Sequence, residues 1–294
     1  MFNGAIMKSG LSKSSCEIVD TDYKAAFDFL VMTWVFAVLK AKGLHPDVIK
    51  RLQNLYNDNI TVVVVNNMLG RAFTNCRLSL RQGDLPSMFW FAFAIDPLLI
   101  YLEKRLTGLP IYKLPVAGPV LRKEPPLPPL EERYKVISYA DDVKPGITSM
   151  KEFLLVDQAS LLFEKASGCV LHRDPNSGKC KVLLLGRWRG TFQQEDIPVN
   201  YFIISDYLDM VGVELRATNT KTRMVNGDEL VKRVKNKVGP WQAGKCMPLT
   251  QRPWSLNTYV VSKVVYRCSS VDLRVKDITA ITSKLKAWLF IDQF

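Results

Sequence analysis

The sequence is poor in residues that bind metals through sulfur or imidazole and in residues that form disulfides. Its 294 residues include only two histidines and six scattered cysteines, with no CxxC pair. This pattern argues against a zinc finger or knuckle and against a disulfide-stapled secreted domain. The N-terminal segment lacks the apolar core of a signal peptide, and no run of about 18 apolar residues is free of charge. We therefore expect a soluble intracellular protein that does not act at a membrane, located in the nucleus, the cytoplasm or both.

What is present is a globular composition with an uneven positive charge. Hydrophobic residues make up 48% of the chain, which is enough to bury a core, and the net charge is +12. Residues 216–294 hold 15 Lys and Arg against 5 Asp and Glu, a balance of +10, whereas residues 1–215 have a balance of only +2. Such a basic segment attracts the phosphate backbone of nucleic acids. It is also typical of a solvated helical face, so charge alone leaves both interpretations open.

The order of the predicted elements indicates an α+β fold, because helices alternate with antiparallel hairpins before a mostly helical end. We predict helices over residues 25–40, 48–56, 87–106 and 151–167, and hairpins over residues 60–80, with a turn near Leu69–Gly70, and 135–148. We expect two domains. Residues 1–215 form an antiparallel sheet packed on helices, and residues 216–294 form a small basic helical segment.

Two acidic positions are candidates for chemistry. Asp22 follows an apolar stretch, and the pair Asp141–Asp142 lies at the predicted turn of a hairpin. If the strands that carry them pair, three carboxylates converge, and they repel one another unless a hard cation such as Mg²⁺ lies between them. Two Mg²⁺ ions at such a site activate a 3′-hydroxyl and stabilise a pyrophosphate leaving group. An Asp-Asp pair is also ordinary turn chemistry, so this pattern alone decides nothing.

Three segments of the sequence carry a family resemblance. DTDYKAAFD, RLSLRQGDLPSMFWFAF and YKVISYADDV resemble, in order and spacing, three motifs of reverse transcriptases. The match is closest to the polymerase of LINE-type (non-LTR) retrotransposons, and it continues through SGCVLHRDPNSGKCKVLLLG and LDMVGVEL to VVSKVVYRC. The resemblance implies a polymerase palm in residues 1–215 and a thumb-like segment in residues 216–294. It also implies an N-terminally truncated chain whose fingers region is largely missing, because few residues precede Asp22.

The resemblance implies catalytic roles for four residues. Asp22, Asp141 and Asp142 would hold two Mg²⁺ ions, for which Mn²⁺ can substitute. Asp20 is an alternative to Asp22, which is favoured by its spacing to the KAAFD segment. Lys179 would protonate or steady the pyrophosphate, although most single surface lysines have no such role.

The resemblance also implies a nucleotide-binding group. Phe27, with the nearby Tyr23, would lie under the sugar, where an aromatic ring excludes a 2′-hydroxyl by steric clash. The loop beside the incoming nucleotide and the templating base would hold Arg81, Gln82 and Gly83. Taken without the family, Phe27 is a core residue of an amphipathic helix and the loop is a simple strand-to-helix turn.

Four further residues would contact nucleic acid. The resemblance implies that Tyr139 supports the primer end, whereas a strand tyrosine more simply packs on a helix. Arg252, Lys263 and Arg267 would grip the primer–template duplex through its backbone.

The resulting hypothesis is an RNA-directed DNA polymerase that adds dNTPs to a primer 3′-hydroxyl. Its partners would be an RNA template, a DNA primer and other parts of a retrotransposon polyprotein. The alternative is a catalytically inactive retrotransposon-derived fragment that only binds nucleic acid. A third interpretation is an interaction scaffold based on the proline-rich residues 124–132.

Overall fold

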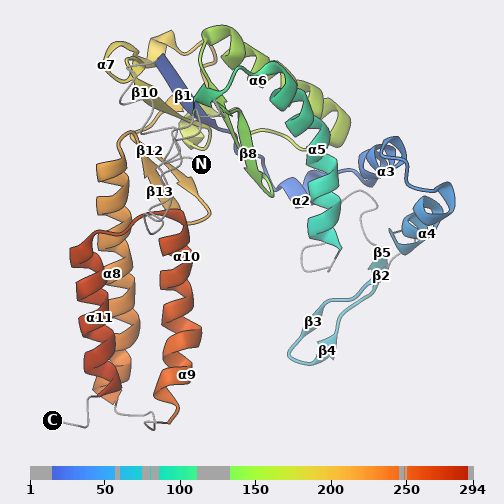
Figure 1. Cartoon of the computed structure of the whole chain (residues 1–294). Coiled ribbons are helices and arrows are strands. Elements are labelled where there is room, and N and C mark those ends of the chain that lie inside the picture. Colours follow the sequence, from blue (N-terminus) through green and yellow to red (C-terminus); the bar gives the residue numbers. More distant parts are fainter. Residues whose placement is uncertain are drawn as a thin grey trace, which may run out of the picture. The chain divides into compact units, whose positions relative to one another are not determined.

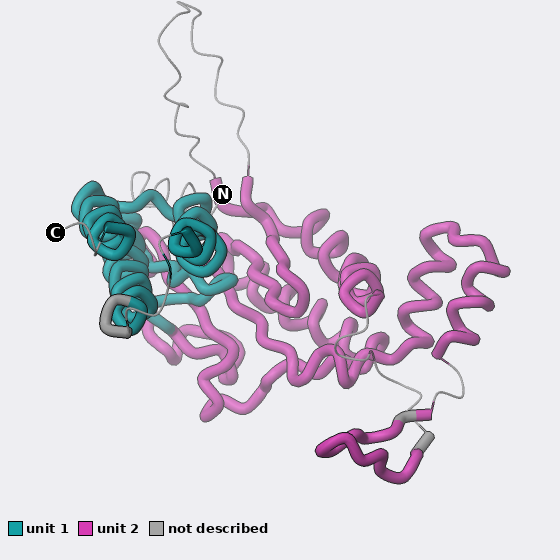
Figure 2. The backbone as a smooth tube through the Cα atoms, turned by 90° about the horizontal axis from the view of Figure 1, so that it is seen from below, with its two compact units in different colours: residues 1–13, 112–127, 205–294 teal, residues 14–111, 128–204 magenta. Residues whose placement is uncertain are grey.

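The computed structural model describes residues 15–56, 60–74, 80, 86–110, 133–244, 248 and 250–290. These residues divide into two compact units (Figure 2). We call the unit within residues 15–204, drawn in magenta, the first unit, and the unit within residues 205–290, drawn in teal, the second unit; the key of Figure 2 numbers them in the opposite order. Helices and mainly antiparallel strands occur together, so the predicted α+β class is confirmed. Among the helices of the described part, none combines the length and the apolar character needed to cross a bilayer.

The first unit is built on a five-stranded sheet with the strand order β11-β10-β1-β9-β8. Its strands are β1 (Ser15–Asp20), β8 (Val136–Tyr139), β9 (Asp142–Ile147), β10 (Lys181–Gly186) and β11 (Ile203–Ile204). Neighbouring strands are antiparallel except for β10 and β11, which are parallel. Strand β1 pairs on one side with β10 and on the other with β9, so it is the central strand. The predicted hairpin over residues 135–148 is confirmed as β8 and β9.

Two long helices pack against strands β8 and β9 (Figure 1): α5 (Ser87–Arg105) and α6 (Met150–Ser167). Apolar side chains of the sheet, such as Val143 and Ile147, share one core cluster with Phe91 of α5 and Phe153 of α6. Helix α6 starts where the hydroxyl of Ser149 accepts the N–H of Glu152, and it ends at Gly168 with φ +80°. A serine N-cap and a left-handed glycine are standard end signals of a helix, which is why its bounds were predictable.

The predicted helix over residues 25–40 is wrong in its continuity. The structure has two helices there, α2 (Ala26–Phe29) and α3 (Met32–Ala41), separated by extended Leu30 and Val31. Leu30 is fully buried, and the N–H of Val31 donates to the carbonyl of Ser167 at 2.8 Å. This tertiary hydrogen bond replaces a helical one, so packing overrides the local propensity.

The hairpin over residues 60–80 turns at a different place from the one predicted. After α4 (Pro46–Tyr56), β2 (Ile60–Thr61) pairs with β5 (Phe73–Thr74), and β3 (Val64–Val65) pairs with β4 (Met68–Leu69). The turn is Asn66–Asn67, with φ +50° and +62°, and not Leu69–Gly70. Asparagine tolerates left-handed backbone because its short side chain bonds locally, so this pair suits a two-residue hairpin turn. A further short pair joins β6 (Leu109–Pro110) and β7 (Arg133–Tyr134).

The second unit is a hairpin followed by helices. Its elements are β12 (Tyr207–Met210), β13 (Val213–Arg216), α8 (Asn219–Gly244), α9 (Arg252–Leu256), α10 (Ser262–Ser270) and α11 (Val275–Leu289), with one π-helical turn, η3 (Asn257–Val261), joining α9 to α10. Their buried residues form a separate core, which includes Leu230, Val234, Val260, Ile281 and Trp288. Strand β13 packs on α8, so the hairpin groups with the helices, whereas the expected boundary after residue 215 would divide them.

A buried carboxyl lies in the centre of the sheet. Glu17 of β1 is 0% exposed, and its register partners on either side are the apolar Ile147 and Leu184. Neither carboxyl oxygen has a hydrogen-bond partner among the described residues. Burial raises the pKa of Glu17 to about 8, so the side chain is protonated at neutral pH.

Glu17→Met should stabilise the protein, and the gain should increase with pH. Folded Glu17 keeps its proton up to pH about 8, whereas the unfolded chain loses it near pH about 4.5, so wild-type stability falls as pH rises through this window. An apolar side chain of similar length removes this loss and the unpartnered polar group, which costs about 1–3 kcal/mol. Urea unfolding at several pH values from 5 to 8 measures the difference. Glu103→Met, at an exposed site on α5, is the control, and a Glu17→Met protein less stable than wild type at pH 8 would contradict the prediction.

Candidate active site

Strand pairing in the first unit brings the predicted carboxylates to one place. The N–H and the hydroxyl of Thr21 both donate to the carbonyl of Val143, at 3.1 and 2.9 Å. This antiparallel bridge sets Asp22 opposite Asp142 on the neighbouring strand. Residues that lie 120 positions apart in the sequence thus become direct neighbours.

Asp141 occupies the tight turn between β8 and β9. The turn consists of Ala140 and Asp141, and Ala140 has φ +53°, a left-handed conformation that is strained for a residue with a side chain. Burial raises the pKa of Asp141, and the negative charges of Asp22 and Asp142 raise it further. The charge of Asp141 is therefore repelled by those of Asp22 and Asp142, and a cation beside Asp141 would relieve this repulsion.

Asp22 is the accessible member of the group and has two basic neighbours. Its side chain is 37% exposed, and its Oδ2 lies 3.9 Å from Nζ of Lys179 and 3.7 Å from Nε2 of His172. The N–H of His172 also donates to the carbonyl of Asp22 at 2.9 Å. The structure thus places Lys179 beside the carboxylates. Because the pair is exposed, it contributes little to stability and leaves the ammonium available to other anions.

Asp142 and Asp20 share a buried lysine. Nζ of Lys144 lies 2.5 Å from Oδ1 of Asp142 and 2.6 Å from Oδ1 of Asp20, and the lysine side chain is only 1% exposed. Burial raises the pKa of Asp20 to about 6, although the ammonium of Lys144 opposes this shift. Asp20, the alternative to Asp22 as a metal ligand, is therefore a partner of Lys144.

The predicted nucleotide-binding residues have different environments. Phe27 is half-buried, with its ring stacked on Phe91 at a centroid distance of 4.8 Å. Tyr23 is 3% exposed and packs edge-to-face on Phe163, so its ring belongs to the core. Tyr139, at the end of β8, is 57% exposed. Three predicted residues, Arg81, Gln82 and Gly83, lie outside the described residues, as does the proline-rich stretch 124–132.

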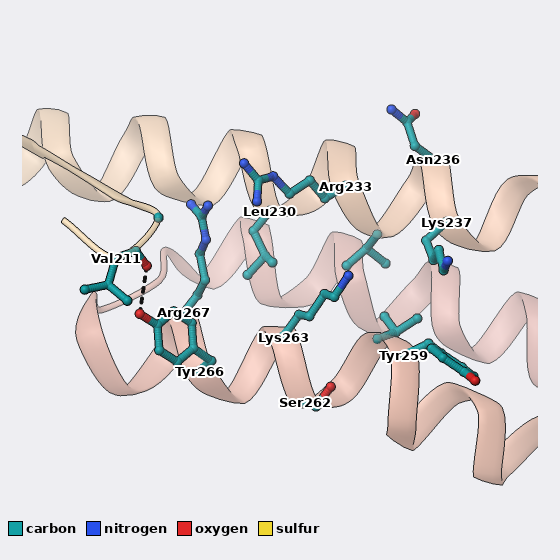
Figure 3. Close-up of a pocket in the computed structure, with 13 residues that line it drawn as sticks. Val211, Leu230, Arg233, Asn236, Lys237, Tyr259, Ser262, Lys263, Tyr266 and Arg267 are labelled. Carbon is teal, nitrogen blue, oxygen red and sulfur yellow. Dashed lines mark hydrogen bonds between the residues drawn. The ribbon is translucent and has the colours of Figure 1, made fainter. Parts of the chain in front are cut away.

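The second unit contains a basic groove of about 590 Å³ between α8 and the helical segment formed by η3 and α10 (Figure 3). Four cationic residues line it, Arg233 and Lys237 from α8 and Lys263 and Arg267 from α10, and none of the described residues lining it is acidic. The groove therefore offers a site for a polyanion.

Aromatic rings extend one end of this basic groove. Nζ of Lys237 lies 5.7 Å from the ring centroids of both Trp241 and Tyr259. Trp254, which is 66% exposed, packs edge-to-face on Tyr259 at 6.2 Å. Tyr259 belongs to the π-helical turn η3, which interrupts the regular helix beside the groove. Exposed aromatic rings next to cations are typical of surfaces that bind nucleic acids.

The three predicted nucleic-acid-binding residues of the second unit differ in exposure. Lys263 and Arg267 line the groove, and Lys263 is exposed. Arg267 is 6% exposed and donates to Oδ1 of Asn226 at 3.0 Å, and its burial, together with the charge of Arg233, lowers its pKa. Arg252 is 4% exposed at the start of α9 and is not one of the residues that line the groove. The groove therefore brings two of the three together.

Comparison with known proteins identifies a relative over almost the whole chain. The chain is 24% identical over 288 residues, 97% of its length, to the uncharacterized 149 kDa protein of transposon TX1 from Xenopus laevis. The chain is related to a transposon protein. It spans 20% of the length of that relative, and no family model matches it. The predicted resemblance to a retrotransposon protein is confirmed at this level.

Sequence reasoning missed two residues at the carboxylate edge of this transposon-related chain. His172 lies beside Asp22, and the available signal was its position as one of only two histidines, within the SGCVLHRD segment. Lys144 lies two residues after Asp142, and side chains two apart in a strand share a face. A lysine in an otherwise apolar strand needs a buried anionic partner, and this was the signal that could have identified it.

One of the three carboxylates expected to bind metal is already engaged by a lysine. Among the described residues, no group of three or more His, Cys, Asp or Glu side chains is arranged to hold a metal ion. Asp142 is engaged with Lys144, whereas Asp22 and Asp141 retain carboxylate oxygens of the kind that Mg²⁺ prefers. The three-carboxylate set expected for two ions is therefore not free in this arrangement.

Lys144→Met should destabilise this transposon-related chain strongly. Removal of the ammonium leaves Asp20 and Asp142 facing each other in a mostly buried site, and loss of one partner from a buried ion pair costs about 3–5 kcal/mol. The free energy of unfolding at pH 7, from urea titration, measures the loss. Lys165→Met, at an exposed position of α6, is the matched control and should change stability by less than about 0.5 kcal/mol. Equal stability of the two variants would contradict the role of Lys144.

Proposed function

We propose that the chain is the catalytic core of an RNA-directed DNA polymerase. It would add deoxynucleotides to the 3′-hydroxyl of a DNA primer on an RNA template, with the first unit as palm and the second as thumb. The observation that carries the proposal is the meeting of Asp22 with the Asp141–Asp142 turn where the antiparallel strands β1 and β9 adjoin. The relationship to a transposon protein over 97% of the chain supports it.

Asp22 and Asp141 would be the principal ligands of Mg²⁺, for which Mn²⁺ can substitute. Their charges interact, and Asp22 is accessible to solvent, so both suit a site that a hydrated ion and a triphosphate must reach. A bound ion would supply activation of the primer hydroxyl and neutralisation of phosphate charge. Asp142 would contribute only if it left Lys144.

Two further side chains of the first unit would position the nucleotide. Lys179 is 59% exposed and lies 3.9 Å from Asp22, so its flexible ammonium can contact phosphate oxygens beside the carboxylates. Phe27 is fixed by stacking on Phe91, and a fixed ring is what the steric exclusion of a 2′-hydroxyl requires. Tyr139, exposed at the end of β8, would support the primer end.

The basic groove of the second unit would bind the phosphate backbone of the primer–template duplex. None of the described residues that line it is acidic, which favours contacts to phosphates without regard to sequence, and Arg233 also pairs with Glu229 of its own helix at 2.8 Å. Lys263 and Arg267 would then act together with Arg233 and Lys237.

Primer extension tests the polymerase proposal directly. The purified chain should extend an oligo(dT) primer on a poly(rA) template with dTTP and Mg²⁺, and Asp141→Asn should reduce the rate by about 100-fold or more because a charged carboxylate ligand becomes a neutral amide. Asp47→Asn, an exposed aspartate at the first turn of α4, is the matched control and should extend like wild type. No extension by a folded wild-type chain, or full extension by Asp141→Asn, would refute the proposal.

A second candidate function is nucleic-acid binding without catalysis. The engagement of Asp142 with Lys144 favours it, because it removes one carboxylate from the catalytic set. This candidate requires that RNA or DNA binding survives Asp141→Asn while neither protein extends a primer.

Both candidates require the basic groove to bind nucleic acid, and its lysines should determine the salt dependence. Lys237→Ala combined with Lys263→Ala should weaken binding of a labelled RNA–DNA duplex and reduce the slope of log Kd against log salt by about 2, one for each lost phosphate contact. Fluorescence anisotropy from 50 to 200 mM salt measures this slope. Lys276→Ala with Lys284→Ala, exposed on α11, is the control of equal charge. An unchanged slope in the groove variant would exclude the groove as the binding surface.

A further inference from the structure

The side chain of Lys144 lies between two carboxylates of the sheet. Nζ of Lys144 contacts Oδ1 of Asp20 at 2.6 Å and Oδ1 of Asp142 at 2.5 Å. The Thr21–Val143 bridge sets Lys144 opposite Asp20, two residues along each strand from the Asp22–Asp142 pair. Side chains two apart in a strand share a face, so the lysine and the aspartates form one patch on one face.

The burial of this patch makes its charge balance important. The side chain of Lys144 is 1% exposed, and those of Asp20 and Asp142 are 14% and 29% exposed. Two carboxylates so close together in a mostly buried place require a cation between them. An ammonium that touches one oxygen of each carboxylate bridges them as a divalent ion would, and it neutralises one of their two negative charges.

The backbone that carries Lys144 is itself fixed. The hydroxyl of buried Tyr134 donates to the carbonyl of Lys144, and β9 is paired on both sides, with β8 and with β1. A lysine on a strand held in this way has little freedom to withdraw its ammonium. The cation is therefore a lasting part of the fold and not a surface side chain that happens to lie nearby.

We propose that Lys144 is a built-in counter-cation that takes the place of one divalent ion at the carboxylate edge. It retains Asp142 as a partner of Asp20 and leaves Asp22 and Asp141 to bind a single ion. Lys144 is thus a positioning residue that sets the number of ions. The inference rests on the proposed function, because only that function requires divalent ions at this edge.

Counting bound Mn²⁺ ions tests this proposal without nucleotide or primer. Mn²⁺ is titrated into the purified chain, and the free ion is measured by electron paramagnetic resonance. Lys144→Met should bind one more ion per chain than wild type, because it frees two carboxylates for the ion. Lys144→Arg keeps the charge and should bind as many ions as wild type. Adding Asp20→Asn to Lys144→Met should abolish the extra ion.

The effect of Mn²⁺ on thermal unfolding is a second readout. If Lys144 only formed a structural ion pair, Mn²⁺ would raise the Tm of Lys144→Met no more than that of wild type. Mn²⁺ should raise the Tm of Lys144→Met by more than it raises the Tm of wild type, Lys144→Arg or the exposed-site control Lys165→Met, because the ion replaces the missing ammonium. If Lys144→Met folds only when Mn²⁺ is present, that result also supports the replacement of the ammonium by an ion.

Two variants that retain Lys144 keep the proposal testable if Lys144→Met does not fold at all. Asp141→Asn should weaken Mn²⁺ binding by about tenfold or more, and Asp142→Asn should weaken it by less than that. Two ions bound to wild type, one of them lost in Asp142→Asn, would overturn the proposal. So would a folded Lys144→Met that binds the same number of ions as wild type.

The ion count and the extension assay separate this inference from the proposed function. Failure of wild type to extend a primer, with the expected ion counts, refutes the polymerase and leaves the role of Lys144 intact. If wild type extends the primer and Lys144→Met binds as many ions as wild type, only the role of Lys144 is refuted.

Discussion

The pairing of β1 with β9 is the constraint on which the candidate site depends. One carbonyl, that of Val143, accepts both the N–H and the hydroxyl of Thr21, and this fixes the register of two segments far apart in the sequence. A slip of one residue would turn every side chain to the opposite face of the sheet. Asp20 and Asp22 would then point into the apolar core, which a charged pair cannot enter without a large cost. The core and the site therefore require the same register.

The buried ammonium of Lys144 lies beside carboxylates that are partly open to solvent. Three carboxylates on a turn and two strand ends accumulate negative charge at the place where the proposed polymerase would bind a metal, and a fourth carboxylate, Asp20, adds to it. The ammonium stabilises the half of the patch that lies deeper and leaves the outer half open to solvent. The arrangement is compatible with both proposed functions, a polymerase and an inactive nucleic-acid-binding fragment, which differ in chemistry but not in fold.

Much of this could be predicted from the sequence, and the failures have physical reasons. Local signals were sufficient for the α+β class, for the β8–β9 hairpin and for α6, whose ends carry Ser149 and Gly168. They were insufficient at Leu30, where a hydrogen bond from Val31 to a distant carbonyl interrupts a good helical sequence. The partners of Asp22 also depend on long-range contacts. The family motif named Lys179 for a role at the pyrophosphate, and its contact with Asp22 is seen only in the structure. The local pattern around Lys144 indicates a buried anionic partner, but only the strand register identifies Asp20 as that partner.

Gly146 links the packing of the sheet to the geometry of the carboxylates. A Cβ atom at this position would lie 2.6 Å from two carbons of the Tyr134 ring, so the ring occupies the space that a side chain would need. That ring holds the hydroxyl that donates to the carbonyl of Lys144. A methyl group added at position 146 would therefore displace the Tyr134 ring and, with it, the hydrogen bond that holds the backbone of Lys144. The absence of a side chain at Gly146 thus helps to fix the position of the buried ammonium.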